Sequence, residues 1–167
     1  AETLSLGFKR RLALAAALVA ATVPEREPHP DIHNSFATLI EALDSGDGWA
    51  GRYVIWECEL LAALGYGLDL TCCAVTGTTD DLVYVSPRTG RAVSREAGRE
   101  YRDKLLPLPG FLVRDEDAQP GAVGAGLTLA GYFLDRHLMQ PQGRALPEAR
   151  ERLVERMRRH GSGCRRI

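Results

Sequence analysis

The 167-residue sequence lacks the features that mark a secreted, membrane-spanning or strongly charged protein. Its four cysteines make a poor disulfide framework, because two are adjacent and one is nearly terminal. The apolar run at residues 12–23 is too short to cross a bilayer. A formal net charge of −1 gives no sign of a nucleic-acid or membrane partner. These absences favour free thiols in a reducing cytoplasm.

Common catalytic motifs are missing as well. There is no G-x-S-x-G turn and no phosphate-binding glycine loop followed by lysine. The glycine-rich segment 121–126 does not follow a predicted strand, which a dinucleotide-binding fingerprint requires. His29 and His33 have the spacing of two ligands on a helix, but the glutamate of a metalloprotease motif is absent between them. The sequence therefore predicts no catalytic residue and no enzyme.

Apolar residues make up 45% of the sequence, which is enough to form the core of one globular domain. Apolar residues recur at helical spacing in several segments, separated by proline and glycine. The basic residues 9–11 ahead of the first apolar run also resemble a cleaved leader, although we favour the start of a helix. The predicted helices cover residues 3–22, 30–43, 49–64, 96–106, 122–140 and 147–159.

Between the third and fourth predicted helices the apolar period shifts towards two. Residues 82–85 and 91–93 have the pattern of short strands joined by the turn 86–90. Such a hairpin must pack against the helices to be stable. The predicted fold is therefore mostly α, a bundle-like domain of about five or six helices with a small β-hairpin insert.

An ordered set of short motifs carries a family resemblance. It consists of Leu64-Gly65-Tyr66-Gly67, Cys73-Ala74-Val75-Thr76-Gly77, Tyr84-Val85-Ser86-Pro87, Gly90-Arg91-Ala92-Val93-Ser94, and the segments 133–138 and 146–150. The set resembles the C-terminal region of RecO, the bacterial recombination mediator and DNA repair protein. Nothing in the sequence corresponds to the oligonucleotide-binding barrel with which that family begins. Residues 1–167 are thus expected to form a RecO-like helical domain with a zinc-finger-like insert at 67–98.

The resemblance also implies a metal site, which this sequence has lost. Many relatives hold zinc on two C-x-x-C pairs, and these would fall at Cys73, Thr76, Ser94 and Ala97. Only Cys73 can donate a thiolate, so the sequence predicts neither zinc nor any cofactor. The adjacent Cys72 and Cys73 could form a redox switch, but no basic neighbour is present to lower a thiol pKa, which favours inert thiols.

By resemblance, the function is DNA repair and recombination without catalysis. The family assists recombinase loading and strand annealing, docks on the acidic, apolar-ended tail of single-stranded-DNA-binding protein, and works with RecR. DNA contact would come mainly from the missing N-terminal part, with no membrane partner. A tail of that kind needs an apolar pocket with basic groups at its rim. The candidate partner-binding residues are Phe8, Arg11, Arg52, Trp56, Arg136 and Arg150.

A second interpretation comes from the C-terminal charge. Residues 144–167 contain eight arginines and three glutamates. Such a run is usually a solvated helix face, but it could also bind a polyanion directly. In that alternative the chain is a single-stranded nucleic-acid-binding module, and the candidate residues are Arg156, Arg158, Arg159, Arg165 and Arg166.

Overall fold

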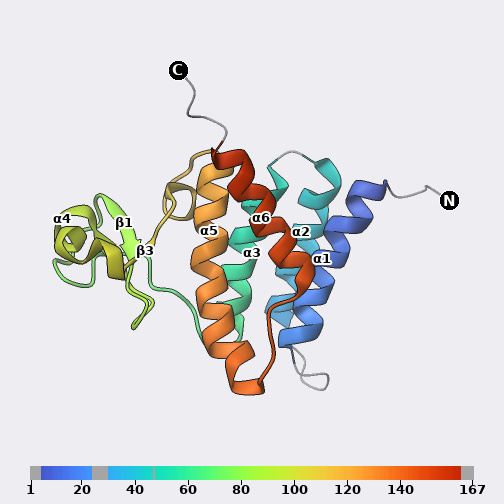
Figure 1. Cartoon of the computed structure of the whole chain (residues 1–167), viewed down its shortest axis with the longest axis horizontal. Coiled ribbons are helices and arrows are strands. Elements are labelled where there is room, and N and C mark those ends of the chain that lie inside the picture. The colour runs from blue at the N-terminus through green and yellow to red at the C-terminus, as the bar shows by residue number, and fades with distance from the viewer. Residues whose placement is uncertain (1–4, 24–29, 47, 163–167) are drawn as a thin grey trace.

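The computed structural model describes residues 5–23, 30–46 and 48–162. Five long helices in this part of the chain form a bundle, and a small insert with a short helix projects from one side of it (Figure 1). The prediction of a mostly α fold is therefore confirmed. The helices are α1 (Leu6–Thr22), α2 (Pro30–Ser45), α3 (Trp49–Ala63), α4 (Arg95–Gly98), α5 (Pro120–Leu134) and α6 (Glu148–Ser162).

Local chemistry sets several helix ends. The Ser5 hydroxyl accepts a hydrogen bond from the Phe8 N–H at 3.1 Å, which caps the start of α1. Pro30 and Pro120 are the first residues of α2 and α5, where the missing N–H leaves no hydrogen bond unmade. Gly65 ends α3 with a φ of +89°, a left-handed conformation that favours glycine.

The insert contains a three-stranded antiparallel sheet in the order β2-β1-β3. Strands β1 (Leu82–Val85) and β2 (Ala92–Ser94) form the expected hairpin, in which Val85 lies opposite Ala92. The short strand β3 (Leu106–Pro107) pairs with the other edge of β1. The third strand was not expected, and Pro107 suits it because an edge strand tolerates a residue without an N–H.

The prediction of a helix at residues 96–106 is wrong. The chain instead forms the short α4, a 3₁₀ helix at Arg99–Lys104, and β3. Gly98 lies directly against the Tyr84 ring, since a Cβ at this glycine would be 2.5 Å from a ring carbon. This close contact holds the segment against the sheet, and the backbone groups of β1 then find partners in β3.

The helix expected at residues 122–140 is present but changes character. The α-helical part begins at Pro120 and ends at Leu134. A π-helical turn, Asp135–Met139, and a short 3₁₀ turn, Gln140–Gln142, continue it. The left-handed Gly143, with a φ of +62°, then turns the chain towards α6.

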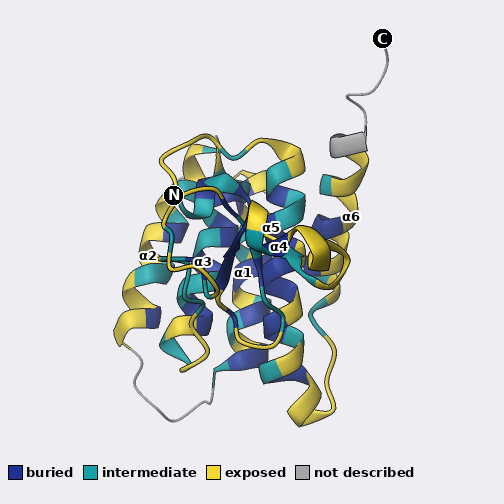
Figure 2. Cartoon of the chain, turned by 90° about the vertical axis from the view of Figure 1, so that its left-hand side faces the viewer, coloured by how far each residue is buried: buried dark blue, intermediate teal, exposed yellow. Residues whose placement is uncertain are grey.

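Helix α3 lies at the centre of the bundle and packs against both α2 and α5. Its Tyr53, Trp56 and Leu60 have no exposed surface. In Figure 2 the buried residues lie on the inner faces of the helices and the exposed residues on the outside. A Cβ at Gly126 would be 2.7 Å from the Val54 side chain, so the glycine-rich start of α5 allows close packing on α3.

The core also holds an ion pair. The carboxylate of Glu57 on α3 accepts two hydrogen bonds, each 2.7 Å long, from the guanidinium of Arg150 on α6. Arg150 also donates to the Leu127 carbonyl at 2.8 Å. Burial acts to lower the pKa of Arg150, but the Glu57 charge and hydrogen bonds raise it above its ordinary value. Arg150 therefore stays charged, and its hydrogen bonds link α3, α5 and α6.

Candidate partner-binding site

A groove lies between α1 and α6. The two helices run side by side in the bundle (Figure 1). The beginning of α3 closes the groove from below, and its volume is about 520 Å³. We call it the α1–α6 groove. It is lined by Gly7, Arg10, Arg11, Ala13, Leu14, Trp49, Ala149, Arg152, Leu153 and Arg156.

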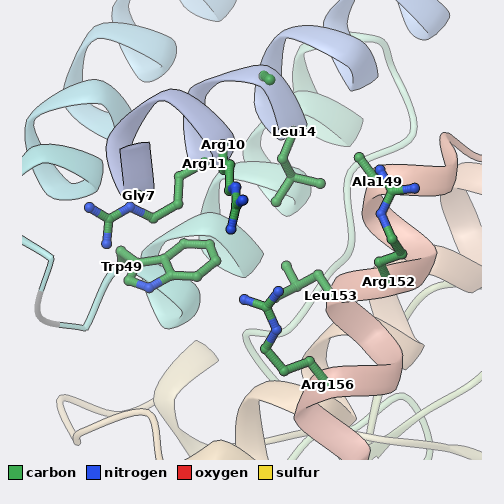
Figure 3. A pocket seen from close by; sticks show the side chains of 10 residues that line it. Gly7, Arg10, Arg11, Leu14, Trp49, Ala149, Arg152, Leu153 and Arg156 are labelled. Atoms are coloured by element: carbon green, nitrogen blue, oxygen red, sulfur yellow. The ribbon is translucent and has the colours of Figure 1, made fainter. Parts of the chain in front are cut away.

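The floor of the groove is apolar. Leu14 of α1 and Leu153 of α6 are part of the core, and each shows only a small exposed surface. Trp49, the first residue of α3, is half-buried and lies between the two helices (Figure 3). An apolar side chain placed here would be shielded from water on several sides, which is favourable in proportion to the area covered.

Arginines surround this floor. Arg10 and Arg11 come from α1, and Arg152 and Arg156 come from α6 on the opposite side (Figure 3). The Arg11 guanidinium lies over the Trp49 ring, with 5.6 Å between the guanidinium carbon and the ring centre. Since guanidinium groups bind carboxylates with two parallel hydrogen bonds, this rim is suited to an acidic ligand.

The carboxylate of Glu148 partly neutralises the positive charge of the rim. Glu148 accepts a hydrogen bond from Arg152 at 2.8 Å, and both side chains are largely exposed. An exposed pair of this kind contributes little free energy, so an incoming carboxylate can compete for the arginine. The buried Nε of Arg11 has no hydrogen-bond partner among the described residues. Arg11 and Arg152 can therefore still donate hydrogen bonds to an anionic ligand in the groove.

Of the predicted partner-binding residues, only Arg11 lines the groove. Phe8 and Trp56 were expected as pocket walls, and this is wrong because both are buried in the core, with 6% and 0% of their surface exposed. Arg150 was expected at a solvent-facing helix end, and this too is wrong because it is 2% exposed and paired with Glu57. Arginine is rarely buried unless it is paired.

Arg52 and Arg136 also lie away from the α1–α6 groove. Arg52 forms two hydrogen bonds with Glu59, of 3.0 and 3.1 Å, and lines a smaller hollow of about 250 Å³ beside the acidic loop 114–118. Arg136 is exposed near the hairpin turn and donates to the Pro87 carbonyl at 2.7 Å. The residues predicted as one site are thus spread over several regions.

The C-terminal arginines differ in their surroundings. Arg156 lines the groove, Arg158 is exposed, and Arg159 forms an ion pair with Glu155 one turn earlier. Arg165 and Arg166 lie outside the described residues. The suggestion that these five residues bind nucleic acid stays a prediction.

The insert does not offer a zinc site. Among the described residues there is no group of three or more histidine, cysteine or acidic side chains that could hold a metal. At the positions expected for ligands, the Cys73 sulfur accepts a hydrogen bond from the Ser94 N–H at 3.3 Å, and the Ser94 hydroxyl caps α4. Hydrogen bonds therefore occupy the place where the resemblance implied metal bonds, and a single thiolate cannot satisfy zinc.

The same hydrogen bonds change the acidity of Cys73. Burial raises the pKa of the thiol, but hydrogen bonds from Thr76 and Ser94 outweigh it and lower the pKa to about 6. The prediction from the sequence considered only basic neighbours, whereas hydrogen bonds lower the pKa of Cys73. That the two thiols are inert stays a prediction. The Cys73 side chain is 1% exposed, so the thiolate faces the interior of the insert and not a substrate.

Comparison with known proteins identifies the family. The family model described as "Recombination protein O C terminal" matches residues 12–145. This chain belongs to the RecO family. The match begins inside α1, continues through α5 with the whole insert, and ends in the loop before α6.

Similar proteins named "DNA repair protein RecO" occur in several bacteria. The RecO of Rhodospirillum rubrum is 52% identical over 161 residues, which cover 92% of this chain and 64% of the relative. The RecO of Caulobacter vibrioides is 51% identical over 156 residues, or 90% of this chain and 64% of the relative. The chain therefore spans somewhat less than two thirds of these RecO proteins. No solved structure matches this chain.

The chain thus corresponds to the C-terminal region that the family model describes, and the relatives it matches are named DNA repair proteins. Among the described helices, none is both long enough and apolar enough to span a membrane. The alternative classes considered from the sequence, a metalloprotease or a dinucleotide-binding protein, are not the family that the comparison identifies.

Sequence analysis missed most of the groove, including Arg10, Trp49, Arg152 and Leu153. One signal was available, because Arg152 and Arg156 are four residues apart and must lie on one side of a helix. Arg10 and Arg11 were also visible as a basic start to α1. The contact between α1 and α6 could not be read, since it joins segments about 140 residues apart.

Proposed function

We propose that this chain is the helical part of a recombination mediator that docks the acidic, apolar-ended tail of single-stranded-DNA-binding protein in the α1–α6 groove. The observation that carries the proposal is the arrangement of four arginines around a floor made by Leu14, Trp49 and Leu153. In the whole protein this docking would serve recombinase loading and strand annealing, together with RecR.

The groove matches such a tail in two respects. The last apolar side chain would lie between Leu14 and Leu153, and full burial of it would contribute roughly 2 to 3 kcal/mol. The preceding carboxylates would meet Arg10, Arg11 and Arg156 at the rim. A dissociation constant on the order of micromolar, about −8 kcal/mol, is expected from a few such contacts.

Calorimetry with two peptides tests the docking. One peptide carries an acidic run and a terminal apolar residue, and the other lacks that last residue. Because the apolar side chain fills the floor, its removal should weaken binding by at least tenfold, more than a change from 50 to 200 mM salt does. Equal affinities for the two peptides would mean that the groove does not bind the tail.

Substitutions place the peptide on the protein. Arg10→Gln and Arg156→Gln should each weaken binding several-fold, since each removes a cation from the rim. Arg102→Gln, at an exposed arginine of the insert, is the matched control and should leave affinity unchanged. Arg136→Ala should also have no effect, because Arg136 does not line the groove. A loss of affinity with Arg102→Gln or Arg136→Ala, and none with Arg10→Gln, would place the site elsewhere.

Direct binding of single-stranded nucleic acid by the C-terminal arginines is the second candidate. The exposed Arg158 and the run of positive charge on α6 favour it. The chain should bind single-stranded DNA only weakly, since it has no counterpart of the family's barrel. Binding through phosphates falls steeply with salt and depends little on sequence, whereas tail docking depends on the last residue of the peptide. A salt titration therefore separates the two.

A further inference from the structure

Three aromatic rings stack in parallel where α3 and α5 end. The Tyr66 and His137 rings are 4.7 Å apart between centres, with 12° between their planes. The His137 and Phe133 rings follow at 6.0 Å and 8°. Phe133 is buried and anchors the stack in the core, whereas Tyr66 is 42% exposed at its outer end. Since His137 covers one face of Tyr66, a ligand can reach the ring only from the opposite face or the edge.

The backbone holds Tyr66 in place. Its N–H donates to the Leu61 carbonyl at 2.8 Å, and the left-handed Gly65 before it turns the chain back over α3. Gly67 lies against Ala62, since a Cβ at this glycine would be 3.2 Å from the Ala62 side chain. The ring therefore sits on a tight, packed turn and not on a loose loop.

A π-helical turn places His137. Residues Asp135–Met139 form this turn at the end of α5, and such turns are frequent at functional sites. His137 lies four residues after Phe133, so the two rings share one side of the helix. The stack is thus built from an irregular helix end, which core packing alone does not require.

A positive charge, Arg136, directly precedes His137 of the stack in the sequence. Tyr132 and Arg136 are also four residues apart, and the Arg136 guanidinium donates to the Tyr132 hydroxyl at 3.2 Å and to the Pro87 carbonyl at 2.7 Å. Arg88, which follows Pro87 in the hairpin turn, is exposed. The nearby acidic groups already have partners, because Asp69 pairs with Arg91, and Asp135 accepts a hydrogen bond from Gln140.

We propose that the outer face of Tyr66 stacks one unpaired base of single-stranded nucleic acid, and that Arg136 contacts an adjoining phosphate. An exposed aromatic face at the end of a fixed stack, with a cation next to the stack in the sequence, has the chemistry by which proteins hold single strands without reading their sequence. A guanidinium suits the phosphate, because it forms strong charge-assisted hydrogen bonds. This site lies on different elements from the α1–α6 groove and does not depend on the docking proposed there.

Stacking can be separated from phosphate binding by the choice of probe. We would measure binding of the 167-residue chain to a fluorescent fifteen-nucleotide oligothymidine and to an abasic oligonucleotide of equal length. Tyr66→Leu should weaken oligothymidine binding about tenfold, because one base stack is lost. The same substitution should leave abasic binding unchanged. Tyr66→Phe keeps the ring and should bind like the parent, and Tyr101→Leu, at an exposed tyrosine of the insert, is the control.

Arg136→Gln should weaken binding of both oligonucleotides to the same extent, because both carry phosphates. The thermal midpoint of each variant shows whether it folds, and quenching of a 2-aminopurine base by the unsubstituted chain gives a readout that needs no substitution. Unchanged oligothymidine affinity in folded Tyr66→Leu would overturn the proposal, and the exposed face would then suit a protein partner. An equal loss for the abasic probe, or no quenching, would overturn it too.

Discussion

Glu57 and Arg150 lie 93 residues apart in the sequence and form a two-pronged ion pair inside the bundle, with both nitrogen–oxygen distances at 2.7 Å. Neither side chain has more than 2% of its surface exposed. The neighbouring Tyr53 has a pKa well above its ordinary value, mainly because it is buried and secondly because the Glu57 charge lies close to it. The pair joins the central helix α3 to the last described helix α6, so it fixes how α6 packs on the centre of the bundle.

Removal of one partner of this pair should destabilise the domain strongly. Arg150→Ala leaves the Glu57 carboxylate buried without a counter-charge, which should lower the free energy of unfolding by about 3 to 5 kcal/mol in urea titrations. Arg152→Ala, at the exposed position two residues later, should change it by less than about 1 kcal/mol. The double substitution Glu57→Leu with Arg150→Met should recover part of the loss. Similar values for Arg150→Ala and Arg152→Ala would show that the buried pair is unimportant for stability.

Gly131 is predicted to be required for the position of Arg150. A Cβ at Gly131 would lie 2.7 Å from one guanidinium nitrogen of Arg150 and 3.0 Å from the other. Gly131→Ala should therefore displace the guanidinium and destabilise the domain by about 1 to 3 kcal/mol. Gly121→Ala is the matched control on the same helix, where nothing lies within 4 Å, and it should be neutral or stabilising by up to about 1 kcal/mol. Thermal melts of the two variants compare them directly, and equal midpoints would contradict the prediction.

The domain should fold without metal. Thr76, Ser94 and Ala97 stand where three zinc ligands were expected, and hydrogen bonds to Cys73 replace them. Elemental analysis of protein purified without chelator should find far less than one zinc per chain. Addition of EDTA should leave the thermal midpoint unchanged, because no metal contributes to the folded state. Stoichiometric, tightly held zinc would refute both the prediction and the matching of these positions.

Acidity should affect stability through Cys73. The folded domain lowers the pKa of this thiol from its ordinary 9.0 to about 6, so the folded state favours the thiolate. The resulting stabilisation is complete above about pH 9, decreases as the pH falls, and is lost below about pH 6. We would measure the urea midpoint of unfolding between pH 5.5 and 9 in the presence of a reductant. As the pH is lowered, this midpoint should decrease less in Cys73→Ala than in the parent.

Cys72→Ala is the control for that series. Cys72 is the adjacent, half-buried cysteine, and its replacement should leave the slope with pH unchanged. If Cys73→Ala and the parent had parallel curves, the hydrogen bonds from Thr76 and Ser94 would not stabilise a thiolate.

The local parts of the fold could be predicted from the sequence, because short-range signals set them. The proline at 30, the glycine at 65 and the period-two pattern of Leu82–Val85 place helix ends and a strand that the structure contains. The prediction of a helix at 96–106 failed because the conformation of this segment depends on contact between Gly98 and Tyr84, and helix propensity does not include such contacts.

The candidate site was harder to predict, because it depends on contacts between distant segments. Arginine is usually found at the surface, and only the pairing with Glu57 across the bundle explains why Arg150 is buried. Trp49 is half-buried and lines the groove together with Leu153 of α6, a neighbour that its own sequence surroundings do not reveal. Arg11 was among the candidates because the family resemblance implied basic groups at the rim of an apolar pocket.

The α1–α6 groove has a consequence for synthesis of the protein. One wall comes from residues 7–14 and the other from residues 149–156, so neither wall binds a ligand by itself. During translation the first wall leaves the ribosome long before the second exists. A nascent or truncated chain that lacks α6 would have no complete groove and would also leave Glu57 without its partner. Partner binding would therefore be confined to chains whose bundle is finished, and incomplete products could not compete for the ligand.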